Sequence, residues 1–271
     1  TNALTYGTDY TTTPAASAGM FMINVPANED TVQFSVNILD DLITEANESA
    51  DLTIMSATGL TVGSITTHVF TVIDNDIFIP TRTIPQVRGM NTAGVLDSLN
   101  KQCKLVGTVL GVNTQTATSG NVAFTIHDGS VGFGVFSAAT SNHGYTVNEG
   151  DVVRVIGKVD QFNGLGQLRA DSIKIISTSA TLPAPKIITA IGEITESDLV
   201  RMNNVTLVNP AQWTNTGSGF NVDITDGTNT IQLRIDADVN LFSQPAPVGT
   251  FDVIGIGGQF DNSSPFTAGY Q

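Results

Sequence analysis

The chain has 271 residues, a formal net charge of −14 and a hydrophobic fraction of 41%. This length predicts two or three domains of about 100–150 residues each, with enough apolar residues to bury a core. The acidic charge argues against direct binding of nucleic acid, because contacts with phosphates need a basic surface. No segment approaches the roughly 20 consecutive apolar residues of a membrane-spanning helix, so the sequence predicts none.

The composition favours an all-β, extracellular protein. The sequence holds 26 glycines and only 13% charged residues, so Thr, Ser, Asn and Gln must supply most of the polar surface. Cys103 is the single cysteine, which excludes an intrachain disulfide. We therefore expect a secreted or cell-surface protein, and we expect this sequence to be a fragment of a longer polypeptide.

The charge is unevenly distributed along the chain. Residues 1–81 contain no Lys or Arg, whereas residues 82–271 hold all 11 basic residues. The first segment carries these acidic residues: Asp9, Glu29, Asp30, Asp40, Asp41, Glu45, Glu48, Asp51, Asp74 and Asp76. An acidic module is therefore followed by a module in which positive and negative charges nearly balance.

Two acidic clusters in the first segment follow predicted strands, which are recognised by alternating apolar residues. Asp40, Asp41 and Glu45 form one cluster, and Asp74 and Asp76 belong to the other. Such carboxylates repel one another unless a cation supplies the missing charge. Ca²⁺ takes six to eight oxygen ligands and suits this set better than zinc does. A solvated acidic rim is the alternative, and the residue types leave both open.

The order of motifs in this segment resembles a Calx-β domain. The matching elements are G-T-D-Y (7–10), D-D-L-I-T-E-A-N-E (40–48), V-G (62–63) and V-I-D-N-D (72–76). The resemblance implies a β-sandwich that binds Ca²⁺ at one end, through Asp40, Asp41, Glu45, Asp74 and Asp76. A full domain of this family carries earlier strands, so the resemblance also implies an N-terminally incomplete sandwich.

A duplicated module occupies the rest of the chain, after a boundary marked by two prolines in residues 77–85. Three identical pairs recur at a constant separation of 98 positions: Asp128 and Asp226, Gly157 and Gly255, and Gln161 and Gln259. Identities held at one separation indicate a repeated domain. We therefore divide the chain into residues 1–77, 78–180 and 181–271.

Each copy has the strand order of an OB-fold barrel. Strands of the first copy are predicted at 104–112, 121–127, 131–136, 151–159 and 167–176. Strands of the second copy are predicted at 199–208, 219–225, 230–235 and 251–257, and a fifth is expected to begin near Gly269. The predicted fold class is all-β: a partial Calx-β sandwich plus two tandem OB-like five-stranded barrels, the second truncated at its last strand.

The repeated segment also resembles OB-like modules of secreted Bacteroidetes-type surface proteins. The resemblance covers residues 82–271 and is carried by motifs such as L-V-G-T-V-L-G-V-N (105–113), H-D-G-S-V-G-F-G-V-F (127–136) and L-V-R-M-N-N-V-T-L (199–207). It implies modules that lie beside extracellular nuclease or phosphatase domains, or that precede a secretion-sorting tail.

The repeated motifs predict a scaffold and no enzymatic activity. The Asp-Gly pairs at 128–129 and 226–227 are typical of hairpin turns. Gln161–Phe162 recurs as Gln259–Phe260, and we interpret these pairs as closing a loop. The sequence contains no nucleophile elbow, no P-loop and no histidine spacing typical of a metal site.

Four residues of the barrels are candidate ligand-binding residues. We expect His127, Phe136 and Arg234 to point outward from the second and third strands of their barrels, the face that binds ligands in OB folds. Trp213 lies in the first loop of the second copy and is a candidate for stacking on a sugar. A cap over the end of the barrel is the alternative for Trp213.

We therefore expect a non-catalytic, calcium-stabilised modular region that acts in adhesion, display or tethering, with other domains of the same polypeptide as its partners. One alternative is an accessory, substrate-presenting region of an extracellular nuclease or phosphatase. Another is binding of polysaccharide by one barrel.

Overall fold

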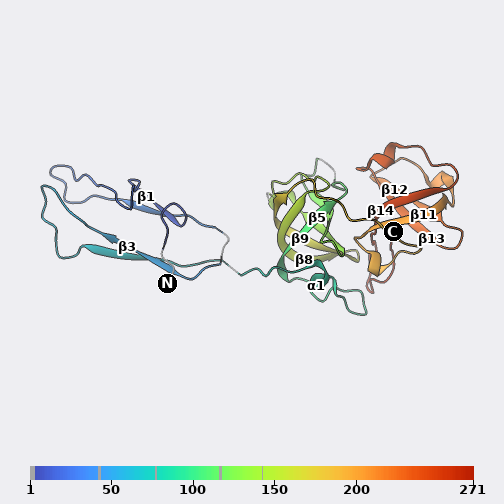
Figure 1. Cartoon of the computed structure of the whole chain (residues 1–271), viewed down its shortest axis with the longest axis horizontal. Coiled ribbons are helices and arrows are strands. Elements are labelled where there is room, and N and C mark those ends of the chain that lie inside the picture. Colours follow the sequence, from blue (N-terminus) through green and yellow to red (C-terminus); the bar gives the residue numbers. More distant parts are fainter. Residues whose placement is uncertain (1–3, 42–43, 77, 116–117, 142) are drawn as a thin grey trace. The chain divides into compact units, whose positions relative to one another are not determined.

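The computed structural model describes every residue except 1–3, 42–43, 77, 116–117 and 142 (Figure 1). The chain divides into two compact units, Thr1–Phe78 and Ile79–Gln271. The regular secondary structure of both is almost entirely β-strand, so the prediction of an all-β protein is confirmed. Within the described ranges, no helix is long and apolar enough to cross a membrane.

The first unit contains two antiparallel strand pairs. Its strands are β1 (Tyr10–Thr13), β2 (Ser35–Ile38), β3 (Glu48–Thr53) and β4 (Thr67–Val72). β1 pairs with β2, with Tyr10 opposite Ile38, and β3 pairs with β4, with Glu48 opposite Val72. The loops after β2 and β4 carry the two acidic clusters, as the alternation of apolar residues predicted.

The first unit buries little apolar surface. Among its described residues the buried side chains are Thr12 and Glu48, both polar, whereas Met22 is almost fully exposed. One aromatic contact links the two strand pairs, because the rings of Tyr10 and Phe70 meet edge to face with centroids 5.4 Å apart. The hydrophobic effect therefore contributes less to this unit than to the second unit.

The first barrel is a closed five-stranded barrel that follows the short helix α1 (Ile84–Arg88). Its strands are β5 (Gln102–Leu110), β6 (Val122–His127), β7 (Gly132–Ser137), β8 (Val152–Phe162) and β9 (Leu165–Ser177). They close in the order β5-β6-β7-β9-β8, with β7 parallel to β9. A 3₁₀ turn, Ala139–Ser141, follows β7.

The interior of the first barrel follows from the alternation of its strands. Leu105, Ile126, Phe133, Val155 and Leu168 come from five different strands and are fully or almost fully buried. Inward side chains of this size fill a small barrel, so its interior is a packed core.

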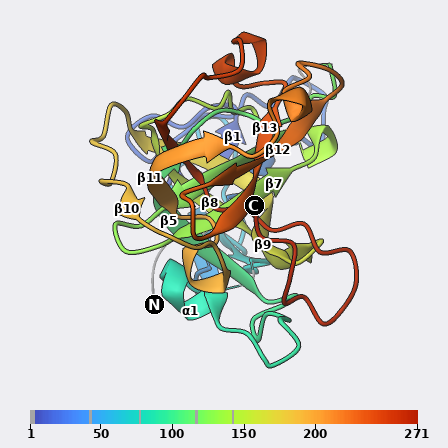
Figure 2. The same cartoon turned by 90° about the vertical axis from the view of Figure 1, so that its right-hand side faces the viewer.

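The second barrel repeats the first four strands of the first barrel, preceded by one short strand, and remains open. Its strands are β10 (Lys186–Ile187), β11 (Leu199–Leu207), β12 (Gly219–Thr225), β13 (Thr230–Asp236) and β14 (Phe251–Ile256). Its 3₁₀ turns are η2 (Glu193–Thr195), η3 (Pro210–Gln212) and η4 (Asn240–Ser243). The sheet runs β10-β11-β12-β13, and β14 pairs with β11. Figure 2 shows the molecule from the side of this barrel.

No strand of the described chain pairs with the outer edge of β13, where β9 pairs with β7 in the first barrel. Gln259 and Tyr270 form one isolated bridge at the corresponding hairpin. The core of the second barrel includes Met202, Val222 and Ile235. The prediction of two OB-like barrels is confirmed, with the first complete and the second open at this edge.

The repeated Asp-Gly pairs form turns, as predicted. Gly129 and Gly227 have φ angles of 96° and 89°, which glycine adopts without strain. Asp128 accepts hydrogen bonds from the backbone N–H groups of Ser130 and Val131, and Asp226 does the same two and three residues further on. These aspartates stabilise turns through their own backbone.

The equivalent glycines Gly157 and Gly255 make a matched test of this architecture. A Cβ atom at Gly157, on β8, would lie 2.2 Å from the Arg169 carbonyl oxygen on β9, whereas a Cβ atom at Gly255, on β14, would meet nothing within 4 Å. Gly157→Ala should therefore lower the free energy of unfolding by about 1–3 kcal/mol. Gly255→Ala should change it by less than about 0.5 kcal/mol. Urea unfolding measures both, and an equal loss in the two variants would contradict the assignment.

Candidate functional site

The two acidic clusters of the first unit surround one cavity. The loops after β2 and β4, together with the segment before β1 and the start of β3, surround a volume of about 520 Å³. Its walls carry seven carboxylates: Asp9, Asp40, Asp41, Glu45, Glu48, Asp74 and Asp76. The structure thus brings together all five residues predicted as metal ligands, and it adds Asp9 and Glu48.

Hydrogen bonds between the loops define one side of this cavity. The Asp74 carboxylate accepts hydrogen bonds from the backbone N–H groups of Glu45 at 3.1 Å and Asp76 at 3.2 Å. The Asp74 backbone N–H in turn donates to Asn47 Oδ1 at 3.2 Å. Asp74 therefore joins the two acidic loops, although 29 residues separate it from Glu45.

The carboxylates of the cavity disfavour one another's ionised forms. Partial desolvation raises the pKa of Glu45, and repulsion from Glu48, Asp41, Asp9 and Asp74 raises it further. Desolvation also raises the pKa of Asp76, with additional repulsion from Asp74, Asp40 and Asp41. A cation inside the cavity would reverse this effect, because an opposite charge nearby favours the ionised form.

The donors of this cavity fit a hard divalent cation in kind and in number. They are oxygen atoms, and the seven carboxylates carry two each, which together exceed the six to eight oxygen ligands that Ca²⁺ takes. In the part of the chain that the structure describes, no three such side chains already converge to metal-binding distances. Binding would therefore require the loops to close around the ion.

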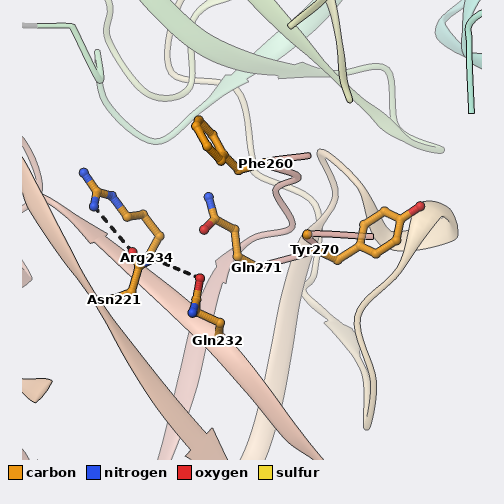
Figure 3. Close-up of a pocket in the computed structure, with 7 residues that line it drawn as sticks. Asn221, Gln232, Arg234, Phe260, Tyr270 and Gln271 are labelled. Atoms are coloured by element: carbon orange, nitrogen blue, oxygen red, sulfur yellow. Dashed lines mark hydrogen bonds between the residues drawn. The ribbon is translucent and has the colours of Figure 1, made fainter. Parts of the chain in front are cut away.

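A second cavity, of about 530 Å³, lies on the outer face of the second barrel (Figure 3). Asn221 on β12 and Gln232 and Arg234 on β13 form a hydrogen-bonded row along one wall. Asn221 Nδ2 donates to Gln232 Oε1 at 2.9 Å, and Arg234 Nη1 donates to Asn221 Oδ1 at 3.4 Å. Arg234 points outward, as predicted.

Arg234 keeps its charge available to a ligand. No carboxylate of the described residues lies within ion-pair distance of its guanidinium group. Phe260, whose side chain is 58% exposed, lines the opposite wall. Tyr270 turns its ring away from the polar row in Figure 3, and its hydroxyl donates to Glu193 Oε2 at 3.3 Å. A cation, amides and one exposed aromatic ring are therefore combined on this face.

Trp213 lies at the end of the second barrel and packs as a cap. Its indole N–H donates to the Gln244 carbonyl at 2.8 Å, and its ring meets Phe220 with centroids 5.5 Å apart. Phe220 contacts Phe242 in turn, so Trp213 extends an aromatic cluster of the core. This geometry favours the cap that we considered as an alternative to sugar stacking.

His127 points outward from its own barrel, but it faces the second barrel and is not exposed to a ligand. His127 is 5% exposed, and its Nδ1 atom accepts a hydrogen bond from the Gly129 N–H at 3.0 Å. Its Nε2 atom lies 3.8 Å from Asp198 Oδ1 of the second barrel. Burial lowers the pKa of His127, and attraction to Asp198 opposes this shift. His127 thus belongs to the interface between the barrels, which strand periodicity does not reveal.

Phe136 is partly buried on β7, between Ala123 on β6 and Arg169 on β9. In the first barrel, β9 covers the edge that stays open in the second barrel. The four candidate residues therefore lie in four separate places, and Arg234 is the one that lines the cavity of about 530 Å³.

The interface between the barrels is built around Asp198, which is completely buried. Lys186 Nζ donates to Asp198 Oδ2 at 2.5 Å, and the Gly132 N–H donates to Asp198 Oδ1 at 2.8 Å. Arg88 Nη1 lies 3.9 Å from the same Oδ1 atom. A Cβ atom at Gly132 would lie 1.7 Å from the Ser197 carbonyl oxygen, so this position requires glycine. Backbone contact and paired charges together join the two barrels.

The repeated glutamines close loops, whereas the repeated phenylalanines do not. Gln161 Nε2 donates to the carbonyls of Gly94 and Gly164, both at 2.6 Å. Gln259 Nε2 donates to the carbonyls of Phe266 and Ala268. Phe162 and Phe260 remain exposed. The loop-closing prediction therefore holds for the glutamines and is wrong for the phenylalanines.

Sequence reasoning missed Asn221, Phe260, Glu196 and Asp198. Asn221 shares one face of β12 with Asp223 and Thr225, so the alternation of that strand contained the signal. Phe260 repeats Phe162 of the first copy, and this recurrence favours a loop-closing role over a ligand-binding one. Glu196 and Asp198, in T-E-S-D (195–198), show no sequence pattern that distinguishes a buried turn from an exposed one.

The buried and exposed ion pairs of this unit allow a matched test. Asp198→Asn leaves Lys186 and Arg88 without their buried counter-charge, and we expect the free energy of unfolding to fall by about 3 kcal/mol. Asp252→Asn breaks the exposed pair with Arg201, which should cost less than about 1 kcal/mol. Urea unfolding followed by the fluorescence of Trp213 measures both, and equal losses would contradict the interface.

No protein-family model matches the chain, and no curated protein matches it. Among solved structures, asparaginyl-tRNA synthetase from Pyrococcus horikoshii is 15% identical with a TM-score of 0.31, over 40% of this chain and 26% of that chain. The hypothetical protein ygiW from E. coli is 16% identical with a TM-score of 0.27, over 35% of this chain and 89% of that chain. This chain thus spans about a quarter of the synthetase. Likenesses at these TM-scores carry no argument about function.

Proposed function

We propose that this chain is a non-catalytic region of a secreted or cell-surface protein, stabilised by Ca²⁺ and acting in adhesion, display or tethering. The observation that carries the proposal is the convergence of seven carboxylates on one cavity in a unit without Lys or Arg. The Calx-β-like motifs, which supply most of these carboxylates, support the same proposal.

Asp9, Asp40, Asp41, Glu45, Glu48, Asp74 and Asp76 would hold the ion. A bound divalent cation would offset the repulsion that raises the pKa of Glu45 and Asp76. Because the unit buries little apolar surface, this electrostatic contribution would be a large part of its stability. A unit stiffened in this way suits the spacing of domains at a surface.

A second candidate function, binding of a saccharide by the second barrel, is favoured by the cavity beside Arg234. Its amide side chains and exposed Phe260 match the polar groups and apolar faces of a sugar ring, and the unpaired Arg234 favours a sugar that carries a negative charge. If the chain instead presents substrate to a nuclease or phosphatase, the ligand of this barrel would be a nucleic acid, and single-stranded DNA is the probe for that alternative.

Calcium should raise the melting temperature of the first unit. At a free concentration 100 times the dissociation constant, one bound ion stabilises the folded state by about 2.7 kcal/mol. Calorimetry of the full chain in Ca²⁺, Mg²⁺ and chelator measures the shift. Trp213, the single tryptophan, lies in the second unit, so its fluorescence transition should stay in place.

Asp74→Asn should remove most of this calcium-dependent shift, because Asp74 bonds both acidic loops. Asp51→Asn is the matched control, since Asp51 lies on β3 away from the cavity. The Ca²⁺ effect should also weaken as the pH falls through the raised pKa values of Glu45 and Asp76. A wild-type protein with no shift in millimolar Ca²⁺ would sink the calcium proposal.

A glycan array that includes uronate-bearing polysaccharides, together with single-stranded DNA, tests the second barrel. We expect Arg234→Ala and Phe260→Ala to weaken saccharide binding at least tenfold, because both side chains face the cavity. Trp213→Phe should leave binding unchanged. Retained binding in the Arg234 and Phe260 variants, or binding of DNA alone, would contradict this candidate function.

A further inference from the structure

A second acidic side chain is buried where the barrels meet, and it has no cationic partner of its own. Glu196 follows η2 and is 2% exposed. Its Oε1 atom accepts a hydrogen bond from the Gly166 N–H of β9, in the first barrel, at 3.1 Å. Its Oε2 atom is buried and has no hydrogen-bond partner in the described structure. The carboxyl group therefore connects the barrels through one oxygen and leaves the other unsatisfied.

The duplication shows that the scaffold does not require an acid at this position. In the first barrel, the Asn100 N–H donates to the Val159 carbonyl, and in the second barrel the Ser197 N–H donates to the Gly257 carbonyl. Asn100 and Ser197 also share a positive φ, of 66° and 58°. The preceding residue is Leu99 in the first barrel and Glu196 in the second. A carboxyl group thus occupies a position where the other copy of the fold has leucine.

The charged groups around Glu196 do not compensate an ionised carboxylate. Glu193 adds repulsion, and the Tyr270 hydroxyl is directed to Glu193. Arg88, on α1, lowers the pKa of Glu196, but its guanidinium group donates to the carbonyls of Glu193 and Gly132 and faces Asp198. The next charges along this interface, Lys186 and His127, face Asp198.

We infer that Glu196 makes a proton-dependent contact between the two barrels: the protonated carboxyl group stabilises their packing, and its ionisation weakens it. A neutral acid can lie in this environment without a counter-charge, whereas a carboxylate with one hydrogen bond and one unsatisfied oxygen cannot do so without cost.

The electrostatics of the site support this direction. Burial raises the pKa of Glu196 to about 7, and repulsion from Glu193 acts in the same direction. The ordinary pKa of this group is 4.5, so its contribution to packing is fully present below about pH 4.5 and is lost as the pH rises through 7. The pKa of His127 is lowered by burial, so His127 contributes above its ordinary value of 6.5 and loses that contribution in acid. The two residues therefore have opposite pH dependences, and a variant is needed to separate them.

The experiment is a pH titration of the full chain and its Glu196→Gln variant between pH 5.5 and 8.5. In wild-type protein, the amide resonance of Gly166 should titrate with a midpoint near 7, because its N–H is bonded to the Glu196 carboxyl group. The titration should be absent in Glu196→Gln, which keeps the acceptor and removes the charge. The equilibrium constant for packing of the barrels should fall about 30-fold between pH 5.5 and 8.5 in wild type.

Two further variants distinguish this contact from a general effect of pH. Glu193→Gln removes the neighbouring repulsion and should move the Gly166 midpoint to lower pH. Glu149→Gln changes an exposed acid whose carboxylate accepts a hydrogen bond from the Gly111 N–H, and it should leave the midpoint in place. A Gly166 amide that does not titrate in wild type, or a titration that persists in Glu196→Gln, would overturn the inference. The pH titration of the Gly166 amide in wild-type protein tests the inference even if a variant fails to fold.

Discussion

The close approach of the Gly132 backbone to the turn that carries Asp198 is the contact on which the second unit depends. Because no side chain fits at Gly132, the turn lies against the backbone of the first barrel and Asp198 is completely buried. That burial requires the cations Lys186 and Arg88 to face Asp198, and it places His127 at the interface. One steric constraint therefore fixes a network of charges and makes two similar barrels a single compact unit.

The first unit is held by different forces. It has two strand pairs linked by one aromatic contact and no buried apolar side chain among the described residues. Its acidic loops approach one another across a cavity, where the pKa of Glu45 and of Asp76 is raised. Each ionised carboxylate there adds repulsion that no Lys or Arg of residues 1–81 offsets. The proposed cation would supply the missing attraction.

The sequence predicted what depends on local pattern and missed what depends on the approach of distant segments. Alternation placed the barrel strands almost as they occur, and it placed Arg234 on the outer face of β13. The same reasoning failed for His127, since its outward direction leads to the other barrel and not to water. Likewise, Glu196 and Asp198 belong to a four-residue polar segment, T-E-S-D, that resembles an exposed turn in sequence. Its two acids are buried because the two barrels pack together. Periodicity describes a strand and its own barrel, and it contains no information about the neighbour.

Comparison of the two copies shows where the duplicated scaffold has diverged. β9 covers the edge of β7 in the first barrel, so the positions of Gly134 and Phe136 are enclosed by a fifth strand. The equivalent positions of the second barrel carry Gln232 and Arg234, which stay exposed beside a cavity. The buried turn has also changed, from Leu99 to Glu196. The first barrel thus has apolar and small residues at positions where the second barrel has polar ones, so the two copies differ in the chemical groups that they expose or bury.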